Sequence, residues 1–329
     1  MADIRRKAIV TLLIGEAYVE AFERFIRPTW QPYAERHGYD LVALTELIDP
    51  NADTAKKSLH WQKLLIGVHP ALKDYDKLVW MDADILINHR LAPCIASAHI
   101  GNGIGAVTMP PPDTDFCGPD GSRSALHMVM ENLRARTQNP DRNPSVFLQA
   151  DHADYYRVLG LDGEAPHLIN TGVLVFDPRR HGATLAGIYM KYDRDFIDFE
   201  MTPLSFEIQN QGLLDPLDPR FNTPWALHAL THYPFLFNDD LREAHPDLLS
   251  QCVNAAFRQV WFLHFAGTRN HPVSKRPLDL VDPTCPRITD LVFPDLAEKW
   301  PHWFRFVDGE GFKQACAQVD DGADIDVFY

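Results

Sequence analysis

The chain has 329 residues, of which 46% are hydrophobic and 23% are charged, a composition typical of globular proteins and unlike that of disordered chains. Its 31 Lys and Arg against 45 Asp and Glu give a formal net charge of −14. A phosphate backbone or an anionic membrane is repelled at long range by such a charge. We therefore expect no nucleic-acid partner.

Cysteine spacing and hydropathy exclude several other classes. The five cysteines are far apart and form no CxxC pair, so neither a disulfide scaffold nor a zinc module is expected. The apolar run at 8–14 is too short for a signal-peptide core, and no stretch approaches the roughly 20 apolar residues that span a bilayer. We expect a cytoplasmic protein without a transmembrane segment.

The first ninety residues alternate between strand and helix patterns. Residues 7–14 and 39–44 are apolar and rich in β-branched side chains, and apolar residues recur at helical spacing between them. A helix pattern at 58–72 then leads into a strand pattern at 74–87. This order predicts an α/β, Rossmann-like fold with a mostly parallel central sheet flanked by helices.

The middle of the chain is different in character. Residues 108–166 are rich in Pro, Gly and Asp, which we interpret as a long insertion over one face of the fold. A strand is predicted at 167–176, helices at about 183–199 and 206–214, and a last strand at 259–267.

The end of the chain is Pro-rich and aromatic. We expect one domain over 1–275 and a C-terminal tail over 276–329. The tail carries Trp300, Trp303 and Phe306 close to basic residues. Such a cluster can pack on the domain, contact a sugar or make weak peripheral contact with a membrane.

Two acids follow the apolar strand KLVWM directly. Alternate residues of an extended segment point the same way, so Asp82 and Asp84 can face one cavity and offer oxygen ligands to Mg²⁺ or Mn²⁺. Ligands of open α/β sheets bind at the carboxyl ends of strands. The same tripeptide also fits a plain polar strand end with a turn.

One histidine stands in a similar position. His264 follows the apolar run VWFL, and an imidazole with two carboxylates is a plausible ligand set for Mn²⁺. A strand-end histidine can equally be a hydrogen-bonded structural residue. Its metal role depends on its sharing a site with Asp82 and Asp84.

Four segments, in this order, carry a resemblance to a known family. LHWQKLLIG, DYDKLVWMDADILI, LINTGVLVF and HFAGTRNHP resemble motifs of the metal-dependent GT-A glycosyltransferases, the branch with glycogenin, lipooligosaccharide galactosyltransferases, and fungal and plant galactosyl- and xylosyltransferases. The resemblance implies a GT-A type fold. It also implies that Asp82 contacts the donor ribose and the metal, and that Asp84 and His264 complete the ligands of Mn²⁺ or Mg²⁺.

The resemblance also implies contacts with a nucleotide-sugar donor. Lys63 matches a lysine that approaches the donor, and Thr11 and Tyr18 lie where the family holds the base and ribose. Gly267 lies in the loop that binds the diphosphate. The family's lysine of this loop falls on Asn270.

Because the chain departs from the family pattern at that position, a nearby cation is expected to replace the lysine. Arg269 and Lys275 are the candidates. We include both among the residues expected to bind the donor phosphates.

Three residues are catalytic candidates from the resemblance. Asn170 lies where the family contacts the sugar, and Gln211 matches an amide near the anomeric carbon in retaining members. Asn210 replaces the acid of that motif, which leaves Glu207 as a further polar contributor. Retention is favoured, and inversion by a carboxylate base is the alternative.

The resemblance implies an enzyme that moves a hexose or pentose from a nucleotide sugar, a UDP-sugar in first place, to a saccharide or glycoconjugate acceptor. One alternative is a sugar nucleotidyltransferase or a metal-dependent phosphohydrolase. The first strand is followed by IGEAYVEAFER, which lacks the Gly-rich loop of a nucleotidyltransferase. A second alternative is a non-catalytic protein that binds a nucleotide sugar.

Overall fold

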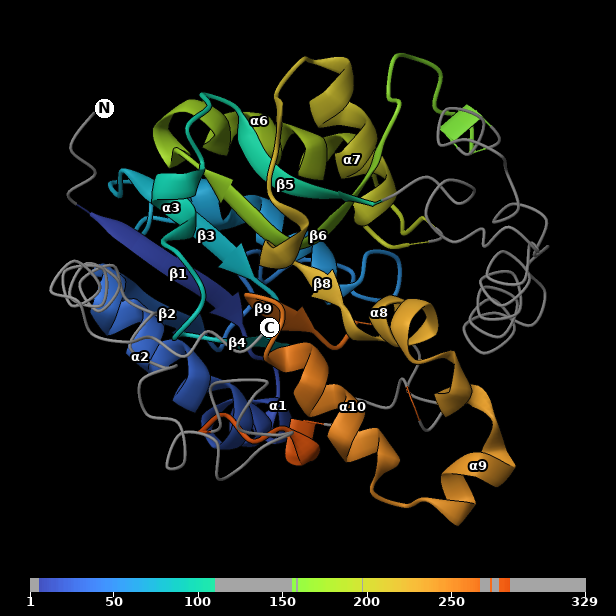
Figure 1. Cartoon of the computed structure of the whole chain (residues 1–329). Helices are drawn as coiled ribbons and strands as arrows, with labels where there is room; N and C mark the ends of the chain where they lie inside the picture. Colours follow the sequence, from blue (N-terminus) through green and yellow to red (C-terminus); the bar gives the residue numbers. More distant parts are fainter. Residues whose placement is uncertain are drawn as a thin grey trace, which may run out of the picture. The chain divides into compact units, whose positions relative to one another are not determined.

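The computed structural model in Figure 1 describes residues 6–109, 156–157, 159–196, 198–266, 273 and 278–284. The strands are β1 (Lys7–Leu12), β2 (Asp40–Leu44), β3 (Lys77–Met81), β4 (Ile85–Ile87), β5 (Ile104–Met109), β6 (Leu168–Phe176), β7 (Leu214–Pro216), β8 (Thr223–Pro224) and β9 (Phe262–His264). The α-helices are α1 (Glu16–Ala21), α2 (Arg27–His37), α3 (Ile95–Ala98), α6 (Pro178–Lys191), α7 (Met201–Asn210), α8 (Trp225–His232), α9 (Asp239–Ala244) and α10 (Leu248–Phe257). A π-helical turn, Phe22–Ile26, joins α1 to α2, and the 3₁₀ helices are η2 (Leu59–Val68), η4 (Pro219–Phe221), η5 (Pro234–Phe237) and η6 (Leu278–Leu280).

The main sheet has six strands in the order β2-β1-β3-β6-β5-β7. The neighbours β1–β2, β1–β3 and β5–β7 are parallel, and β6 runs antiparallel to both β3 and β5. The expected α/β fold with a mostly parallel central sheet flanked by helices is therefore confirmed (Figure 1).

Both faces of this sheet are buried, which explains why its central strands are continuously apolar. Ile9, Val79 and Val173 point into one hydrophobic cluster, which includes side chains of α2 and α10. Their chain neighbours, such as Trp80 and Leu174, point into a second cluster with side chains of η2, α6 and α7. The alternation follows from the two-residue period of a strand.

The segment predicted as one strand at 74–87 is two strands in two sheets. The main-chain N–H of Ile85 donates to the carbonyl of Asp82 (3.3 Å), which closes a turn between β3 and β4. β4 then pairs antiparallel with β9, and β9 pairs parallel with β8, in a small sheet of its own. The turn places both acids between the two sheets.

Other elements differ from the expectation in type or extent. The helix expected at 58–72 is the 3₁₀ helix η2, and the helix expected at 183–199 begins at Pro178 and ends at Lys191. Asp177 starts that helix by accepting a hydrogen bond from the N–H of Arg179 with its side chain, and proline is favoured at the first helical position. The strand β5 and the helices α8 to α10 were not predicted.

Most of the expected insertion and tail lies outside the described residues. Residues up to Pro283 form one compact unit, and Thr284–Tyr329 are assigned to a second. The division at 275 stays a prediction. Among the helices of the described residues, none combines the length and the apolar character needed to cross a bilayer.

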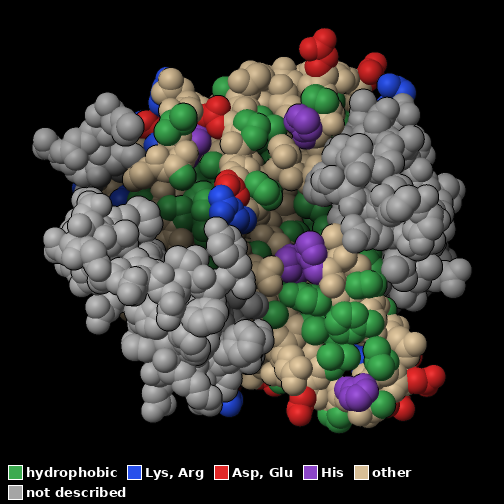
Figure 2. Space-filling model, in the orientation of Figure 1, with side chains coloured by type: hydrophobic (Ala, Val, Ile, Leu, Met, Phe, Trp, Pro, Cys, Tyr) green, Lys and Arg blue, Asp and Glu red, His purple; other side chains and the backbone are tan. Residues whose placement is uncertain are grey.

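Helix α8 contains a half-buried histidine with a buried ring nitrogen. On the face shown in Figure 2, histidine and hydrophobic side chains lie together where α8 runs. The Nε2 atom of His228 is buried and finds no hydrogen-bond partner in the described part of the chain. Burial, followed by the neighbouring His232, lowers the pKa of His228 to about 4. Its ring is therefore neutral in the folded protein at neutral pH.

We expect this histidine to make the fold sensitive to acid. The unfolded chain binds a proton at His228 near pH 6.5 and the folded chain only near pH 4, so stability falls as pH drops through this window. The change is up to about 3 kcal/mol, and it should be absent in His228→Phe. Urea unfolding from pH 7 to pH 4 measures it, with the exposed His245→Phe as the control. An equal loss of stability in wild type and His228→Phe would contradict the assignment.

Candidate metal centre

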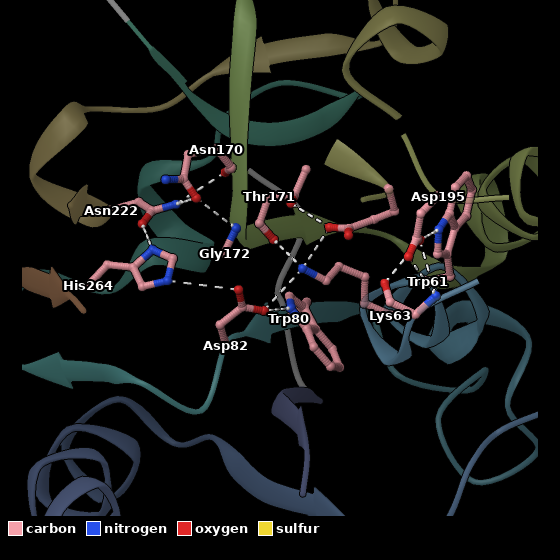
Figure 3. Close-up of polar contacts among 12 residues, drawn as sticks. Trp61, Lys63, Trp80, Asp82, Asn170, Thr171, Gly172, Asp195, Asn222 and His264 are labelled. Atoms are coloured by element: carbon pink, nitrogen blue, oxygen red, sulfur yellow. Dashed lines mark hydrogen bonds and ion pairs between the residues drawn. The ribbon is translucent and has the colours of Figure 1, made fainter. Parts of the chain in front are cut away.

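The two acids are placed by strand β3 and the turn after it. Met81 pairs with Val173 of β6, and the main-chain N–H of Asp82 continues the ladder by donating to the carbonyl of Gly172 (2.8 Å). The carboxylate Oδ1 of Asp82 accepts a hydrogen bond from Nε1 of Trp80 (2.7 Å). This fixed Oδ1 leaves Oδ2 on the side of His264 (Figure 3).

His264 reaches the acids from the small sheet. It pairs with Ile85 of β4, and the N–H of Phe265 donates to the main-chain carbonyl of Asp84 (2.9 Å). The Nε2 atom of His264 lies 3.2 Å from Oδ1 of Asp84 and 3.8 Å from Oδ2 of Asp82. The strand-end histidine and the two strand-end acids therefore share one site, as the ligand hypothesis requires.

These three side chains fit a divalent cation. One ligand atom from each of Asp82, Asp84 and His264 lies within 4.8 Å of the others, and two carboxylates with an imidazole suit Mn²⁺ by donor type. Asp84 and His264 are 8% and 3% exposed. Among the described residues no other group of three such ligands was found.

A buried lysine stands on the other side of Asp82. Lys63 lies on η2 and is 1% exposed. Its Nζ atom is 3.1 Å from Oδ1 of Asp82 and 2.9 Å from Oε1 of Glu200, and it donates to the carbonyl of Thr171 (3.3 Å). The hydroxyl of Thr171 donates to the same Glu200 oxygen (2.6 Å). The three N–H donors of the ammonium thus have three acceptors within the protein.

The charges of this network decide its protonation. Burial alone lowers the pKa of Lys63, but Asp82 and Glu200 outweigh it, so the pKa is raised and the ammonium stays charged. Burial alone raises the pKa of Asp82, but the opposing effect of the Lys63 ammonium is the largest of those that lower it, and the pKa is lowered. Asp82 is therefore an ionised carboxylate, the form that binds a cation.

Glycine is required beside the imidazole. A Cβ atom on Gly172 would lie 2.3 Å from Cε1 and 2.7 Å from Nδ1 of His264. Non-bonded carbon and nitrogen atoms do not approach each other so closely in proteins. The small Gly172 therefore permits the close approach of the histidine ring.

We expect Gly172→Ala to weaken cation binding at least about tenfold, because the imidazole must move away from the acids. Gly187→Ala is the matched control, since a Cβ at Gly187 of α6 meets nothing within 4 Å. Mn²⁺ titration followed by electron paramagnetic resonance measures both variants. Unchanged Mn²⁺ affinity in Gly172→Ala would contradict the expected displacement.

The residues expected to hold the base and ribose lie near a cleft. A cleft of about 470 Å³ at the end of β1 is lined by Leu13, Gly15, Glu16, Val19, Glu20 and Thr45. Tyr18 is 42% exposed on helix α1, which supplies three of these lining residues. Thr11 is only 1% exposed, and its hydroxyl has no hydrogen-bond partner among the described residues. Gly267, Arg269 and Lys275 lie outside the described residues.

Two of the catalytic candidates are not brought to the cation ligands. Glu207 binds Lys191 (2.6 Å) and the Tyr192 hydroxyl (2.5 Å), and the Gln211 amide donates to Glu207 (3.4 Å). Gln211 caps the C-terminal end of α7, about 15 Å along the helix from Glu200. The strand that follows, β7, pairs with the start of β5, at the opposite end of the sheet from Asp82. Their catalytic roles stay predictions.

Two residues at the site were missed by sequence reasoning. Asn222 contacts His264 (Nδ1 to Oδ1, 2.8 Å), and Glu200 pairs with Lys63. Glu200 follows Phe199, a non-glycine residue with φ 57°, a left-handed conformation that costs about 1–2 kcal/mol. Neither residue belongs to a recognisable motif, so only the folded chain reveals them.

Comparison with known proteins gives matches in structure alone. No protein-family model matches the sequence, and no curated protein matches it. A crystal structure of a glycosyltransferase involved in the glycosylation of the major capsid of PBCV-1 matches with a TM-score of 0.46 and 13% identity, over 84% of this chain and 100% of that one. The apo bifunctional glycosyltransferase WbbM matches with a TM-score of 0.47 and 14% identity, over 82% of this chain and 47% of that one.

A third match is the galactosyltransferase LgtC in complex with donor and acceptor sugar analogues. It has a TM-score of 0.41 and 13% identity, over 83% of this chain and 94% of that one. The mostly parallel sheet and the strand-end group of Asp82, Asp84 and His264 are those that the glycosyltransferase resemblance implies.

Proposed function

We propose that the protein is a metal-dependent glycosyltransferase that moves a hexose or pentose from a nucleotide sugar, a UDP-sugar in first place, to a saccharide or glycoconjugate acceptor. One observation carries the proposal. The four segments that resemble glycosyltransferase motifs supply Lys63, Asp82, Gly172 and His264, and these residues meet at one end of β3. Segments so far apart in sequence have no local reason to converge.

The chain's own residues prepare this site for an anionic donor. Asp82, Asp84 and His264 would hold Mn²⁺ or Mg²⁺, which when bound offsets the negative charge that develops on the leaving nucleoside diphosphate. Lys63 keeps Asp82 ionised and fixed through its contact with Oδ1. The cleft beside β1, a short distance along the same sheet edge, is the proposed place of the base and ribose.

We favour retention of the anomeric configuration. Inversion needs a carboxylate that can take a proton from the acceptor. Glu200, which contacts Lys63 together with Asp82, is 2% exposed and already accepts from both Lys63 and Thr171, so it is not placed to take a proton from an acceptor. Asn170 is the proposed contact with the transferred sugar.

Release of nucleoside diphosphate tests the proposal without a known acceptor, because a transferase can slowly pass the sugar to water. UDP-, GDP- and TDP-sugars are incubated with the protein and Mn²⁺, Mg²⁺ or a chelator. We expect one donor to turn over with metal and none with chelator. The products also separate the alternatives, since a nucleotidyltransferase or a phosphohydrolase releases a different phosphate species.

A non-catalytic protein gives another pattern. It would bind a nucleotide with Mn²⁺ and gain thermal stability, about 2.7 kcal/mol at 100 times the Kd, without turnover of any donor. If no donor is turned over and no nucleotide stabilises the protein, the proposal is overturned altogether.

A further inference from the structure

His264 contacts an asparagine, Asn222, on the side of its ring that faces away from the two acids. The Nε2 atom of His264 faces the two carboxylates, and its Nδ1 atom lies 2.8 Å from Oδ1 of Asn222. Asn222 and His264 are 1% and 3% exposed, so water does not compete for this contact. Whether Nδ1 donates or accepts in this contact then depends on which amide atom Asn222 presents (Figure 3).

The orientation of the Asn222 amide follows from its other contacts. Its second amide atom lies 3.1 Å from the carbonyl oxygen of Asn170 and 3.0 Å from Oδ1 of Asn170. A carbonyl oxygen can only accept, so the atom between these two oxygens must be the donor Nδ2. The Asn222 oxygen is thereby turned toward His264.

Asn170 is itself fixed in orientation. Its Oδ1 atom accepts a hydrogen bond from the main-chain N–H of Gly172 (3.0 Å), a donor that cannot change role. The Gly172 N–H therefore fixes the donor and acceptor of each following hydrogen bond, from Asn170 to Asn222 and from Asn222 to Nδ1 of His264. The final donor is the imidazole N–H.

We propose that Asn222 is a positioning residue that holds His264 in its Nδ1–H form, which leaves the lone pair of Nε2 for a cation held by Asp82 and Asp84. This inference rests on the proposed metal site and names how that site is prepared. Ligating histidines are oriented by the partner of their other ring nitrogen, and loss of that partner weakens metal binding about 10–100-fold.

The histidine tautomer can be read directly in the wild-type protein. We use protein labelled with ¹⁵N-histidine and saturated with diamagnetic Mg²⁺, so that the proposed site holds a cation. The His264 ring is assigned by its absence from His264→Gln. We expect a protonated Nδ1 and an unprotonated Nε2. A ring protonated at Nε2 instead would overturn the proposal, and this test requires no change at Asn222.

Mn²⁺ titration followed by electron paramagnetic resonance gives the second test. We expect Asn222→Ala to bind Mn²⁺ about 10–100-fold more weakly than wild type. Asn254→Ala is the matched control, because Asn254 is also buried, at 6% exposed, and donates to main-chain carbonyls of Ser250 and Leu280. It should lose stability without a change in Mn²⁺ affinity.

Asn170→Asp separates this role from the proposed sugar contact. The side-chain contacts of Asn170 among the described residues both use Oδ1, so the aspartate keeps them, while it loses the amide N–H₂. We expect Asn170→Asp to keep the Nδ1–H tautomer and Mn²⁺ binding, because both the main-chain carbonyl of residue 170 and the Oδ1 acceptor remain for Asn222.

The outcomes distinguish the two proposals. Wild-type Mn²⁺ affinity in Asn222→Ala would overturn the positioning role alone. Mn²⁺ binding that depends on Asn222, without turnover of any nucleotide sugar, would overturn the proposed function and leave the positioning role standing. Absence of Mn²⁺ binding in wild type would overturn both.

Discussion

Asp84→Ala is expected to abolish metal-dependent donor turnover and to leave the protein folded. The variant loses a carboxylate whose Oδ1 lies 3.2 Å from Nε2 of His264. Several kcal/mol of charge stabilisation depend on a bound cation in such sites, which corresponds to a loss of about a thousandfold or more. The link between β4 and β9 uses the main-chain carbonyl of Asp84 and the N–H of Phe265 (2.9 Å), which alanine retains.

The measurement compares nucleoside diphosphate release and the thermal unfolding midpoint in the same preparations. Asp53→Ala is the control, because the side chain of Asp53 is 57% exposed and pairs with a surface lysine. It should match wild type in both. Full metal-dependent turnover by Asp84→Ala would remove Asp84 from the ligand set, whereas loss of the folded state would show a structural role instead.

The sequence predicts the part of the site that follows directly from strands. Asp82 and Asp84 stand at the end of an uninterrupted apolar run, and His264 follows another, so each is recognisable without knowledge of the partner strand. Their meeting depends on the pairing of Ile85 with His264. That pairing joins segments 179 residues apart, and only the resemblance to a family indicated it.

The remaining site residues could not be predicted because their roles arise from tertiary contacts. Asn222 precedes the two-residue strand β8, whose pairing with β9 brings it to His264, and no pattern marks a strand that short. Lys63 was expected to approach the donor. It lies on η2, is 1% exposed, and has its ammonium against Asp82 and Glu200. Helical periodicity cannot distinguish a lysine that contacts a donor from one that is buried in an ion pair.

Helix α7 presents its other end to the site. The resemblance suggested a catalytic residue, Gln211, at the C-terminal end of this helix, but the residue that contacts Lys63 is Glu200, which precedes its first residue. A ten-residue helix separates its two ends by about 15 Å. Sequence patterns locate a helix better than they locate the end that faces a site.

Lys63→Met is expected to destabilise the protein by about 3–5 kcal/mol, the usual cost of removing one partner from a buried ion pair. The change leaves the carboxylates of Asp82 and Glu200 without the ammonium that lies 3.1 Å and 2.9 Å from them. Glu200 is 2% exposed, so water cannot replace the lost charge. Urea unfolding in the absence of metal measures the effect.

Two variants show whether the loss comes from the buried charges. Lys56→Met removes a lysine whose side chain is 73% exposed and whose partner is Asp53 (3.5 Å), and it should change stability by less than about 1 kcal/mol. In Lys63→Met with Glu200→Gln one uncompensated charge is gone, so part of the lost stability should return. If instead Lys63→Met unfolds like wild type and loses only donor turnover, the lysine acts on the donor, and the buried network is not what holds Asp82 in place.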